Sequence, residues 1–246
     1  MTLSIDVLLA PPCSAEVVRD KHVAVVDVLR ATTTIATALA HGAAGVIPVA
    51  SAEEAADLAR RLGREDVLLC GERHALRIEG FDLDNSPASF APEVVRGKTL
   101  VMTTTNGTAA LRAVAGAASV RTAALANRMA VADALAQENG AILVACAGES
   151  GRFALEDALG AGALVDALLS LCADVEIGDG ARAAALLYRC VSERLADAIA
   201  SADHAQTLAA KGFARDVTRC AALDTLDVVP TLRDGVIVAR TPVPAR

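Results

Sequence analysis

The segment "KTLVMTTTNGTAALRAVAGA" (residues 98–117) joins an apolar run, a polar turn and an Ala- and Leu-rich run without a break. The apolar run predicts a buried strand over residues 98–104, and the Ala- and Leu-rich run predicts a helix over residues 107–115. The hydroxyl, amide and glycine residues between them therefore lie where a strand passes into a helix. A second segment, "DVLRATTTIATAL" (residues 27–39), has almost the same order.

The same alternation of apolar runs and helical patterns continues along most of the chain. The apolar runs are continuous, which is typical of strands buried on both faces. Strands that alternate with helices form a parallel sheet between two helix layers. We therefore predict a three-layer α/β/α fold with a mostly parallel sheet. The expected strands are 22–29, 45–50, 66–72, 98–104, 119–125 and 141–147, and the expected helices are 33–41, 52–62, 107–115, 128–138 and 155–171.

The pattern changes after Gly178, where helical patterns become longer and strands become rare. The expected elements are a long helix over 181–202, a shorter helix over 204–211, and two late strands over 216–222 and 235–239. The tail "TPVPAR" (241–246) is expected at the surface. No Gly/Ser-rich or Pro-rich linker divides the chain, so we predict one domain over residues 1–246.

The composition excludes some partners. The formal net charge of -7 argues against a nucleic-acid surface, which requires a basic patch. It does not argue against a small anionic substrate, because a few local arginines can make a positive pocket on an acidic protein. The absence of a P-loop, and of a G-x-G-x-x-G motif after a strand, disfavours nucleotide binding.

The cysteines and the apolar segments predict the cellular compartment of the protein. The six cysteines have no C-x-x-C or zinc-site spacing, which favours free thiols in a reducing cytosol. The N-terminus has no basic residues before an apolar core, and the most apolar helix, around residues 161–172, is too short to span a bilayer. We therefore expect a cytoplasmic protein without a membrane partner.

The first candidate site is the polar turn of the opening segment. Ligands of open α/β sheets bind at the carboxyl ends of the strands, and a helix N-terminus attracts anions. A glycine there lets an oxyanion approach the backbone. We therefore expect an anion-binding site, although plain N-capping by Thr105 or Asn106 is the simpler alternative. The candidate residues are Thr103, Thr104, Thr105, Asn106 and Gly107.

The second segment adds two charged side chains. Asp27 ends an apolar strand, where it could bind Mg²⁺ or attack phosphorus, and Arg30 could bind a phosphate with two nitrogens. Thr32, Thr33 and Thr34 could cap the next helix and contact the same anion. The alternative is an Asp–Arg ion pair that stabilises the turn. The Asp-x-Asp arrangement of haloacid-dehalogenase-type phosphatases is missing, because Leu29 stands at the second position.

Two further loops carry candidate side chains. "GERHALRIEGFDLDNSP" (71–87) is dense in carboxylates that could bind Mg²⁺, with Arg73 nearby, although a solvated charged loop is equally compatible. "CAGESGRFALEDALGAGALV" (146–165) contains Gly148 in a flexible loop before a helix. The acids Glu156 and Asp157 are expected to complement the dipole of that helix.

One histidine remains as a candidate. His204 stands beside Asp203 at the start of an expected helix and could donate a proton to a leaving group. A surface or helix-capping role is the alternative, and the sequence favours it over catalysis.

Taken in order, these segments resemble the 2-phosphosulfolactate phosphatase family. The resemblance rests on "DVLRATTTIATAL", "GER", "GFDLDNSP", "TTTNGT", "CAG…FALEDALGAGA" and "SADHAQTLAAKGFARDV", and runs from about Val23 to about Ile237. It implies an α/β/α fold with a mixed sheet and a Mg²⁺-dependent hydrolase. That enzyme releases phosphate from 2-phosphosulfolactate and leaves 3-sulfolactate, a step toward coenzyme M in methanogens. The chain departs from the family pattern at Asp84 and Ala205, where glycines are usual.

The sequence thus predicts a Mg²⁺-dependent phosphatase of 2-phosphosulfolactate. The alternatives are a broader phosphatase of phospho-2-hydroxy acids and a non-catalytic anion-binding protein. The substrate carries phosphate, carboxylate and sulfonate on three carbons, so the two threonine-rich turns would bind different anions. The oligomeric state stays open between a monomer and a homodimer. The expected roles are catalysis by Asp27 and Arg30, metal binding by Asp27, Glu72 and Asp82, and substrate binding by Thr32, Thr33, Thr34, Arg73, Thr103, Thr104, Thr105, Asn106, Gly107 and Gly148.

Overall fold

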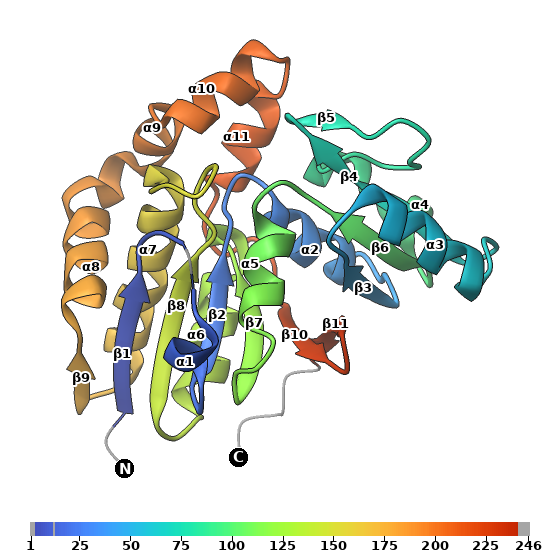
Figure 1. Ribbon diagram of the computed structural model, residues 1–246. Helices are drawn as coiled ribbons and strands as arrows, with labels where there is room; N and C mark the ends of the chain where they lie inside the picture. The colour runs from blue at the N-terminus through green and yellow to red at the C-terminus, as the bar shows by residue number, and fades with distance from the viewer. Residues whose placement is uncertain (1–2, 12, 241–246) are drawn as a thin grey trace.

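A mixed sheet covered by helices on both faces forms the framework of the protein (Figure 1), which confirms the predicted α/β/α class. The computed structural model describes residues 3–11 and 13–240, so the tail "TPVPAR" lies outside the described residues. Within them, the sheet has eleven strands in the order β5-β4-β6-β3-β11-β10-β7-β2-β8-β1-β9. The strands are β1 (Leu3–Leu8), β2 (His22–Val26), β3 (Gly45–Pro48), β4 (Val67–Arg73), β5 (Leu76–Arg77), β6 (Thr99–Thr103), β7 (Ser119–Ala123), β8 (Ala141–Cys146), β9 (Val175–Ile177), β10 (Val229–Arg233) and β11 (Val236–Arg240).

The sheet consists of two parallel blocks joined by a hairpin. Strands β9, β1, β8, β2 and β7 form one block, and β3, β6 and β4 form the other. The antiparallel hairpin β10–β11 pairs with β7 on one side and with β3 on the other. The carboxyl ends of β1, β2 and β8 point toward the same end of the molecule (Figure 1).

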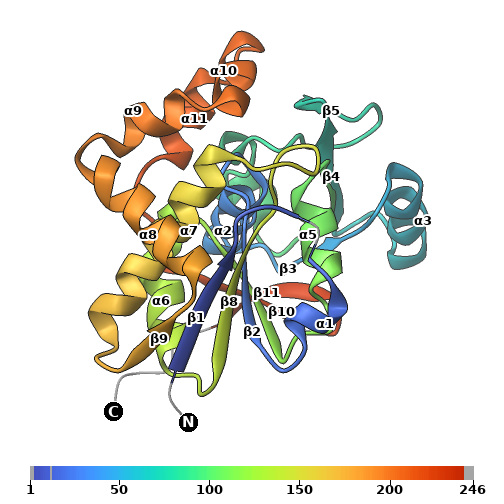
Figure 2. The ribbon, with the colours of Figure 1, turned by 60° about the vertical axis from the view of Figure 1, so that its left-hand side comes forward.

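Helices connect the strands and continue beyond the last parallel strand. The α-helices are α1 (Ala15–Val18), α2 (Ala31–Ala40), α3 (Ala52–Leu62), α4 (Pro92–Val95), α5 (Gly107–Ala113), α6 (Arg128–Ala136), α7 (Leu155–Leu171), α8 (Asp179–Val191), α9 (Leu195–Ala200), α10 (Asp203–Ala210) and α11 (Ala214–Cys220). Short 3-10 turns are η1 (Pro87–Ser89), η2 (Leu125–Asn127) and η3 (Ser192–Arg194). Helices α9, α10 and α11 gather at the end of the sheet toward which β1 and β2 point (Figure 2).

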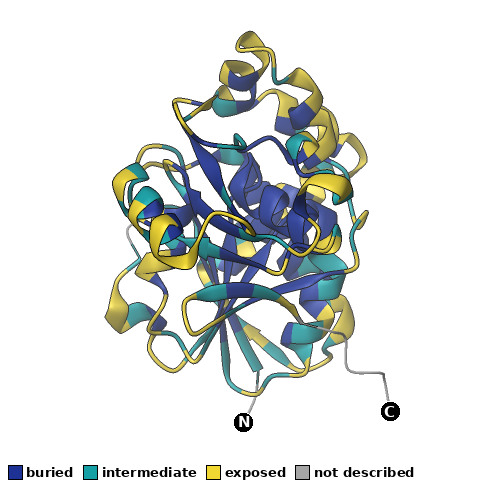
Figure 3. Ribbon diagram, turned by 90° about the vertical axis from the view of Figure 1, so that its right-hand side faces the viewer, coloured by how far each residue is buried: buried dark blue, intermediate teal, exposed yellow. Residues whose placement is uncertain are grey.

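The central strand β2 supplies side chains to two hydrophobic cores. Ala24 and Val26 belong to the core beneath α6, α7 and α8, whereas Val23 and Val25 belong to the core around α2 and α5. Successive strand residues point to opposite faces, so an all-apolar strand serves both layers. Helix α2 is itself buried from Ala31 to Leu39 and lies at the centre of the molecule (Figure 3).

Most expected elements of the first 171 residues are present, but the later part of the chain differs from the prediction. The expected strand over 216–222 is wrong, because residues 216–220 belong to helix α11 (Ala214–Cys220). Asp216, Val217 and Cys220 are buried there, which is the spacing of one helix face rather than of a strand. The long helix expected over 181–202 is divided into α8, η3 and α9. Strands β1, β5, β9 and β10 were not predicted.

The sequence predicts no membrane-spanning helix. None of the helices in the described residues is long and apolar enough to cross a membrane.

Candidate active site

A cavity of about 230 Å³ lies at the carboxyl ends of β2, β4 and β6. Its walls come from six segments: the turn after β2, the β4–β5 hairpin, the loop after β5 that carries Asn85, the turn after β6, the loop after β8, and helix α10 with its C-terminal cap. The segments are distant in sequence, but the parallel strands bring their ends to one edge of the sheet. The lining residues are Asp27, Leu29, Arg30, Glu72, His74, Ala75, Asn85, Thr104, Thr105, Asn106, Glu149, Ser150, His204, Thr207 and Lys211.

Asp27 is the most deeply placed carboxyl group of this cavity. It follows β2 directly and is 6% exposed, and its Oδ1 accepts a hydrogen bond from the backbone N–H of Ala31 at 3.0 Å. Burial raises the pKa of Asp27 to about 6, against the opposing effects of the Ala31 N–H and of His204. Nearby Glu72 and Glu156 raise the pKa further. A carboxyl group that titrates near neutrality in a cavity is typical of a functional site.

Glu72 connects two of the walls. Its Oε1 accepts a hydrogen bond from the N–H of Thr105, and its Oε2 accepts one from the N–H of Ala75, both at 2.8 Å. The buried carboxylate therefore fixes the turn after β6 against the β4–β5 hairpin. Its charge lies within the cavity wall, where it repels the negative charge of Asp27.

The tip of the β4–β5 hairpin has an unusual backbone. His74 and Ala75 have φ values of 54° and 68°, although neither is a glycine. The carbonyl oxygen of Ala75 accepts a hydrogen bond from Arg30 Nη2 at 3.0 Å, and that of His74 accepts one from Lys211 Nζ at 2.7 Å. These contacts, together with Glu72, hold the strained turn over the cavity.

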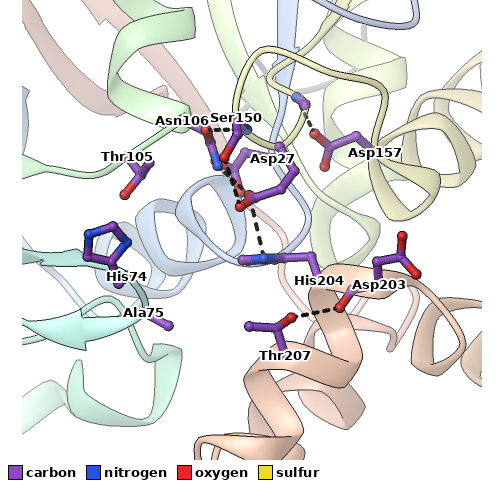
Figure 4. Close-up of polar contacts among 12 residues, drawn as sticks. Asp27, His74, Ala75, Thr105, Asn106, Ser150, Asp157, Asp203, His204 and Thr207 are labelled. Carbon is purple, nitrogen blue, oxygen red and sulfur yellow. Dashed lines mark hydrogen bonds and ion pairs between the residues drawn. The ribbon is translucent and has the colours of Figure 1, made fainter.

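His204 on α10 and Glu149 in the loop after β8 form an ion-pair contact. Nδ1 of His204 lies 3.4 Å from Oε2 of Glu149, and the Nδ2 amide of Asn106 donates to the same oxygen at 2.6 Å (Figure 4). Oδ1 of Asn106 accepts a hydrogen bond from the N–H of Ser150 at 3.1 Å. The contact fixes the ring of His204, which is 18% exposed, at the edge of the cavity.

Oxygen atoms that could hold a hard cation are present in the same cavity. Oδ2 of Asp27 takes part in none of the hydrogen bonds found among the described residues, and Oδ1 of Asn85 is buried without a hydrogen-bond partner. Mg²⁺ is usually bound through one or two carboxylates, together with waters and substrate phosphates. Within residues 3–11 and 13–240, no group of three or more His, Cys, Asp or Glu side chains could hold a metal ion. Asp27 and Asn85 carry oxygen donors of the kind that Mg²⁺ accepts, and both residues line the cavity.

Comparison with known proteins identifies the family to which this chain belongs. The family model described as 2-phosphosulpholactate phosphatase matches residues 12–235, which include every residue that lines the cavity. The chain belongs to the 2-phosphosulfolactate phosphatase family. A probable 2-phosphosulfolactate phosphatase of Thermotoga petrophila is 43% identical over 236 residues, covering 96% of this chain and 98% of the relative. Proteins of the same name from Caldanaerobacter subterraneus subsp. tengcongensis and Symbiobacterium thermophilum are each 42% identical, over 89% and 93% of this chain and 90% and 97% of their own length.

Arg30 occupies a different position in this phosphatase-family chain from the one expected. Its Nη1 donates to Oδ2 of Asp216 at 2.8 Å, its Nη2 binds the hairpin, and its guanidinium lies 4.3 Å from the centre of the Phe213 ring. The group is 2% exposed. Each terminal nitrogen thus makes one protein contact, and together these contacts hold α11 and the hairpin to Arg30, which also lines the cavity. The ion pair anticipated between Asp27 and Arg30 is not found among the described residues, and Arg30 pairs with Asp216 instead.

The threonines that follow Arg30 do not line the cavity. Thr32 Oγ1 donates to the carbonyl oxygen of Asp27 at 2.8 Å, and Thr33 Oγ1 donates to that of Val28 at 2.9 Å. Thr34 Oγ1 donates to the carbonyl oxygen of Asn85 at 2.9 Å. All three are buried, and their hydroxyl groups satisfy nearby backbone carbonyls. The structure therefore does not place a second anion site at this turn.

The turn after β6 is divided between the cavity and the protein interior. Thr104, Thr105 and Asn106 line the cavity, whereas Oγ1 of Thr103 accepts a hydrogen bond from Arg73 Nη2 at 3.0 Å. Asn106 is the N-cap residue of α5, but its side chain makes no capping hydrogen bond. Oγ1 of Thr104 instead accepts a hydrogen bond from the N–H of Thr108 at 3.1 Å.

Gly107 has a reason other than the approach of an anion. A Cβ there would lie 2.5 Å from Cβ of Ala31 and 2.6 Å from Oδ2 of Asp27. The glycine therefore allows α5 to pack against the start of α2 and against the buried carboxylate. The conformation itself would accept other residues, because Gly107 is not among the positive-φ positions.

The loop after β8 is organised by Asp157. Its Oδ2 accepts a hydrogen bond from the N–H of Gly148, and its Oδ1 accepts one from the N–H of Val28, both at 2.9 Å. Burial raises the pKa of Asp157 well above its usual value, and the charges of Asp27 and Glu156 raise it further. Gly148 has φ +68°, and a Cβ there would overlap the carbonyl oxygen of Arg152. Both residues therefore shape the cavity without lining it.

Asp82 lies outside the cavity. Both of its carboxylate oxygens accept hydrogen bonds from Arg64 Nη2 at 3.0 Å, and Oδ2 also accepts one from the N–H of Leu69 at 2.7 Å. The structure thus brings Asp27 and Glu72 together but leaves the third expected metal ligand elsewhere.

Several cavity residues were missed or ranked low from the sequence. His204, Thr207 and Lys211 are spaced by three and four residues, so they share one face of α10. This spacing is visible in the sequence, but the position of α10 over the strand ends is not. Glu149 and Asn85 carried no distinctive pattern, because isolated polar residues in loops are common.

Proposed function

We propose that this chain hydrolyses the phosphate ester of 2-phosphosulfolactate, releasing phosphate and 3-sulfolactate, in a reaction that requires Mg²⁺. The observation that carries the proposal is the cavity in which buried Asp27 lies among the strand ends and His204 lies at the edge. The family model and the relatives named probable 2-phosphosulfolactate phosphatase support the choice of substrate.

In this proposal Asp27 and Asn85 hold the metal through side-chain oxygens. Oδ2 of Asp27 and Oδ1 of Asn85 have no hydrogen-bond partner among the described residues, and both residues line the same cavity. A bound Mg²⁺ supplies charge neutralisation for the phosphate oxygens. Deprotonation of Asp27, which has a pKa of about 6, is required for this role and is nearly complete above pH 7.

His204 supplies the proton that the leaving oxygen needs. Water attacks phosphorus, the bond from phosphorus to the ester oxygen breaks, and the oxygen on C2 of the substrate takes a proton from the imidazolium ring. An aliphatic alkoxide is a poor leaving group, so proton donation in the transition state accelerates the reaction. Oε2 of Glu149 lies 3.4 Å from Nδ1, which leaves Nε2 for the substrate.

A cytoplasmic location is part of the same proposal. All six cysteines are free, including the buried Cys70, Cys146 and Cys220, as expected in a reducing compartment.

The test is phosphate release from synthetic substrates by the purified chain. We expect turnover of 2-phosphosulfolactate with Mg²⁺, no turnover in excess chelator, and restoration when Mg²⁺ is added back. Equal kcat/KM for 2-phosphosulfolactate, 2-phospholactate and phosphoglycolate would instead assign a broader phosphatase. Binding of these compounds without phosphate release would assign an anion-binding protein.

A further inference from the structure

We propose that the cavity face of α10 is a subsite for the strong anion carried by the leaving part of the substrate, with Lys211 as the residue that determines specificity for a sulfonate. The inference rests on the proposed function and adds the orientation of the substrate within the cavity. It also replaces the second anion site expected at Thr32, Thr33 and Thr34, whose hydroxyl groups bind backbone carbonyls.

The geometry of α10 brings three polar side chains to one wall. His204 and Thr207 lie within α10 and Lys211 caps its C-terminus, and all three line the cavity. Figure 4 shows His204 and Thr207 on the same side of the helix. The wall is built from a different part of the chain than the strand ends that carry Asp27 and Glu72, so the two can contact different ends of one ligand.

The charges of the cavity are divided between these two walls. Asp27 and Glu149 follow β2 and β8, and Glu72 lies near the end of β4. Arg30 is neutralised by Asp216 at 2.8 Å, and His204 faces Glu149. Lys211 is the cavity's cation whose observed contact in the described part of the chain is a neutral carbonyl, that of His74. Its charge is therefore not compensated by a carboxylate in that contact.

Lys211 is also held in position for a ligand. An ammonium group has three donors, and one of them binds the carbonyl oxygen of His74 at 2.7 Å. Two donors remain for an oxyanion. The bond to the hairpin restricts the flexible side chain before the ligand arrives, which lowers the entropic cost of binding.

A sulfonate fits this wall better than the strand ends. A sulfonate is a permanent anion, and the carboxylates near Asp27 would repel it in the absence of a metal. The phosphate, by contrast, must reach the oxygen ligands at Asp27 and Asn85. In this inference the phosphate lies at the strand ends and the sulfonate lies at Lys211, with His204 on the same helix wall as Lys211.

The experiment compares two substrates that differ in the sulfonate alone. 2-Phospholactate keeps the phosphate and the carboxylate of 2-phosphosulfolactate but has a methyl group in place of the sulfomethyl group. For Lys211→Met, we expect kcat/KM for 2-phosphosulfolactate to fall about 10- to 100-fold, as for the loss of a charge-assisted hydrogen bond. The value for 2-phospholactate should change less than about 3-fold, and Lys211→Arg should retain most of the preference for the sulfonate.

Lys98→Met is the matched control. Lys98 Nζ binds Asp66 and the carbonyl oxygen of Glu65 before the start of β6, away from the cavity. This variant should leave kcat/KM unchanged for both substrates. If Lys211→Met lowers kcat/KM equally for both substrates, or lowers it for neither, the proposed subsite is wrong.

Product binding separates this inference from the proposed function. The affinity for 3-sulfolactate and for lactate can be measured by calorimetry without any turnover. If the wild-type chain releases no phosphate but Lys211→Met weakens binding of 3-sulfolactate selectively, the subsite stands and the hydrolytic function falls. If 3-sulfolactate binds equally to the wild-type chain and to a folded Lys211→Met variant, the subsite is wrong even where phosphate is released.

Discussion

At the scale of single residues, the cavity depends on a carboxyl group that is unfavourable for folding. Asp27 is buried, and its pKa is raised from 3.8 to about 6. The folded chain therefore binds the Asp27 proton more tightly than the unfolded chain does. The stability from this protonation is fully present below pH 3.8 and is lost as the pH rises through about 6. A buried ionised carboxylate is typical of sites where function opposes stability.

The first prediction concerns Asp27→Asn. The amide keeps an oxygen that can accept the hydrogen bond from Ala31 N–H, but it carries no charge to desolvate. We expect the variant to be more stable than the wild type at pH 8 by about 1–3 kcal/mol, with a smaller difference at pH 4. Denaturant unfolding in chelator at both pH values measures this. If the variant is less stable than the wild type by the same amount at pH 4 and at pH 8, the raised pKa of Asp27 is contradicted.

The second prediction concerns Gly107→Ala. The added methyl group would meet Ala31 and the Asp27 carboxylate. We expect a loss of about 1–3 kcal/mol in the free energy of unfolding, as for other overpacked positions, together with slower turnover. Gly116→Ala is the control, because a Cβ at Gly116 meets no atom within 4 Å. Unchanged stability and activity in Gly107→Ala would show that α5 moves freely relative to Asp27.

At the scale of elements, the ion pair between Arg30 and Asp216 joins parts of the chain that the sheet does not connect. Arg30 follows β2 and Asp216 lies on α11, and Oδ1 of Asp216 also accepts a hydrogen bond from Ser86 Oγ at 2.7 Å. Both charged side chains are at most 5% exposed. The removal of one partner of such a buried pair leaves the other without compensation.

The third prediction separates this structural role from phosphate binding. We expect Asp216→Ala to lower the free energy of unfolding by about 3–5 kcal/mol, because it leaves the Arg30 charge buried. The double variant Arg30→Met with Asp216→Ala should recover part of that loss. Chemical denaturation of the single and double variants measures the coupling. If Asp216→Ala keeps normal stability and alters KM alone, Arg30 is a substrate ligand instead.

The elements also show why the sequence predicts some parts of this chain well and others poorly. The strands β2, β6 and β8 have continuous apolar centres because both faces are buried, and this pattern is visible without a structure. Helix α11 was mistaken for a strand because "DVTRC" contains β-branched residues in a short run. Its burial at Asp216, Val217 and Cys220 depends on the Arg30 pair and on the core, which no local pattern reveals.

At the scale of the whole molecule, the strand order decides which predicted residues meet. Asp27, Glu72 and the turn after β6 were expected at strand ends, and the parallel blocks bring them to one cavity. The hairpin β10–β11, which joins the blocks, includes Pro230 and was only half predicted. The sequence could not predict that Asp82 pairs with Arg64, or that α10 covers the cavity, because both depend on contacts between distant segments.

The fourth prediction concerns His204 and its contact with Glu149. If His204 donates the proton, His204→Gln should lower kcat by about 10²- to 10⁴-fold for the sulfolactate ester. The loss should be much smaller for an aryl phosphate, whose phenolate leaves without protonation. Steady-state kinetics with both substrates measures this. A loss of equal size for the two leaving groups would contradict the role of proton donor.

Phosphate release from 2-phosphosulfolactate by the wild-type chain and by Asp27→Asn, followed by phosphorus NMR with saturating Mg²⁺, tests the central claim most directly. We expect the wild type to convert the ester completely to phosphate and 3-sulfolactate. Asp27→Asn should be slower by at least about 10²-fold, as for the loss of an electrostatic contact in the transition state. An intact ester after incubation with the wild type, or equal rates in the folded variant and the wild type, would contradict the account.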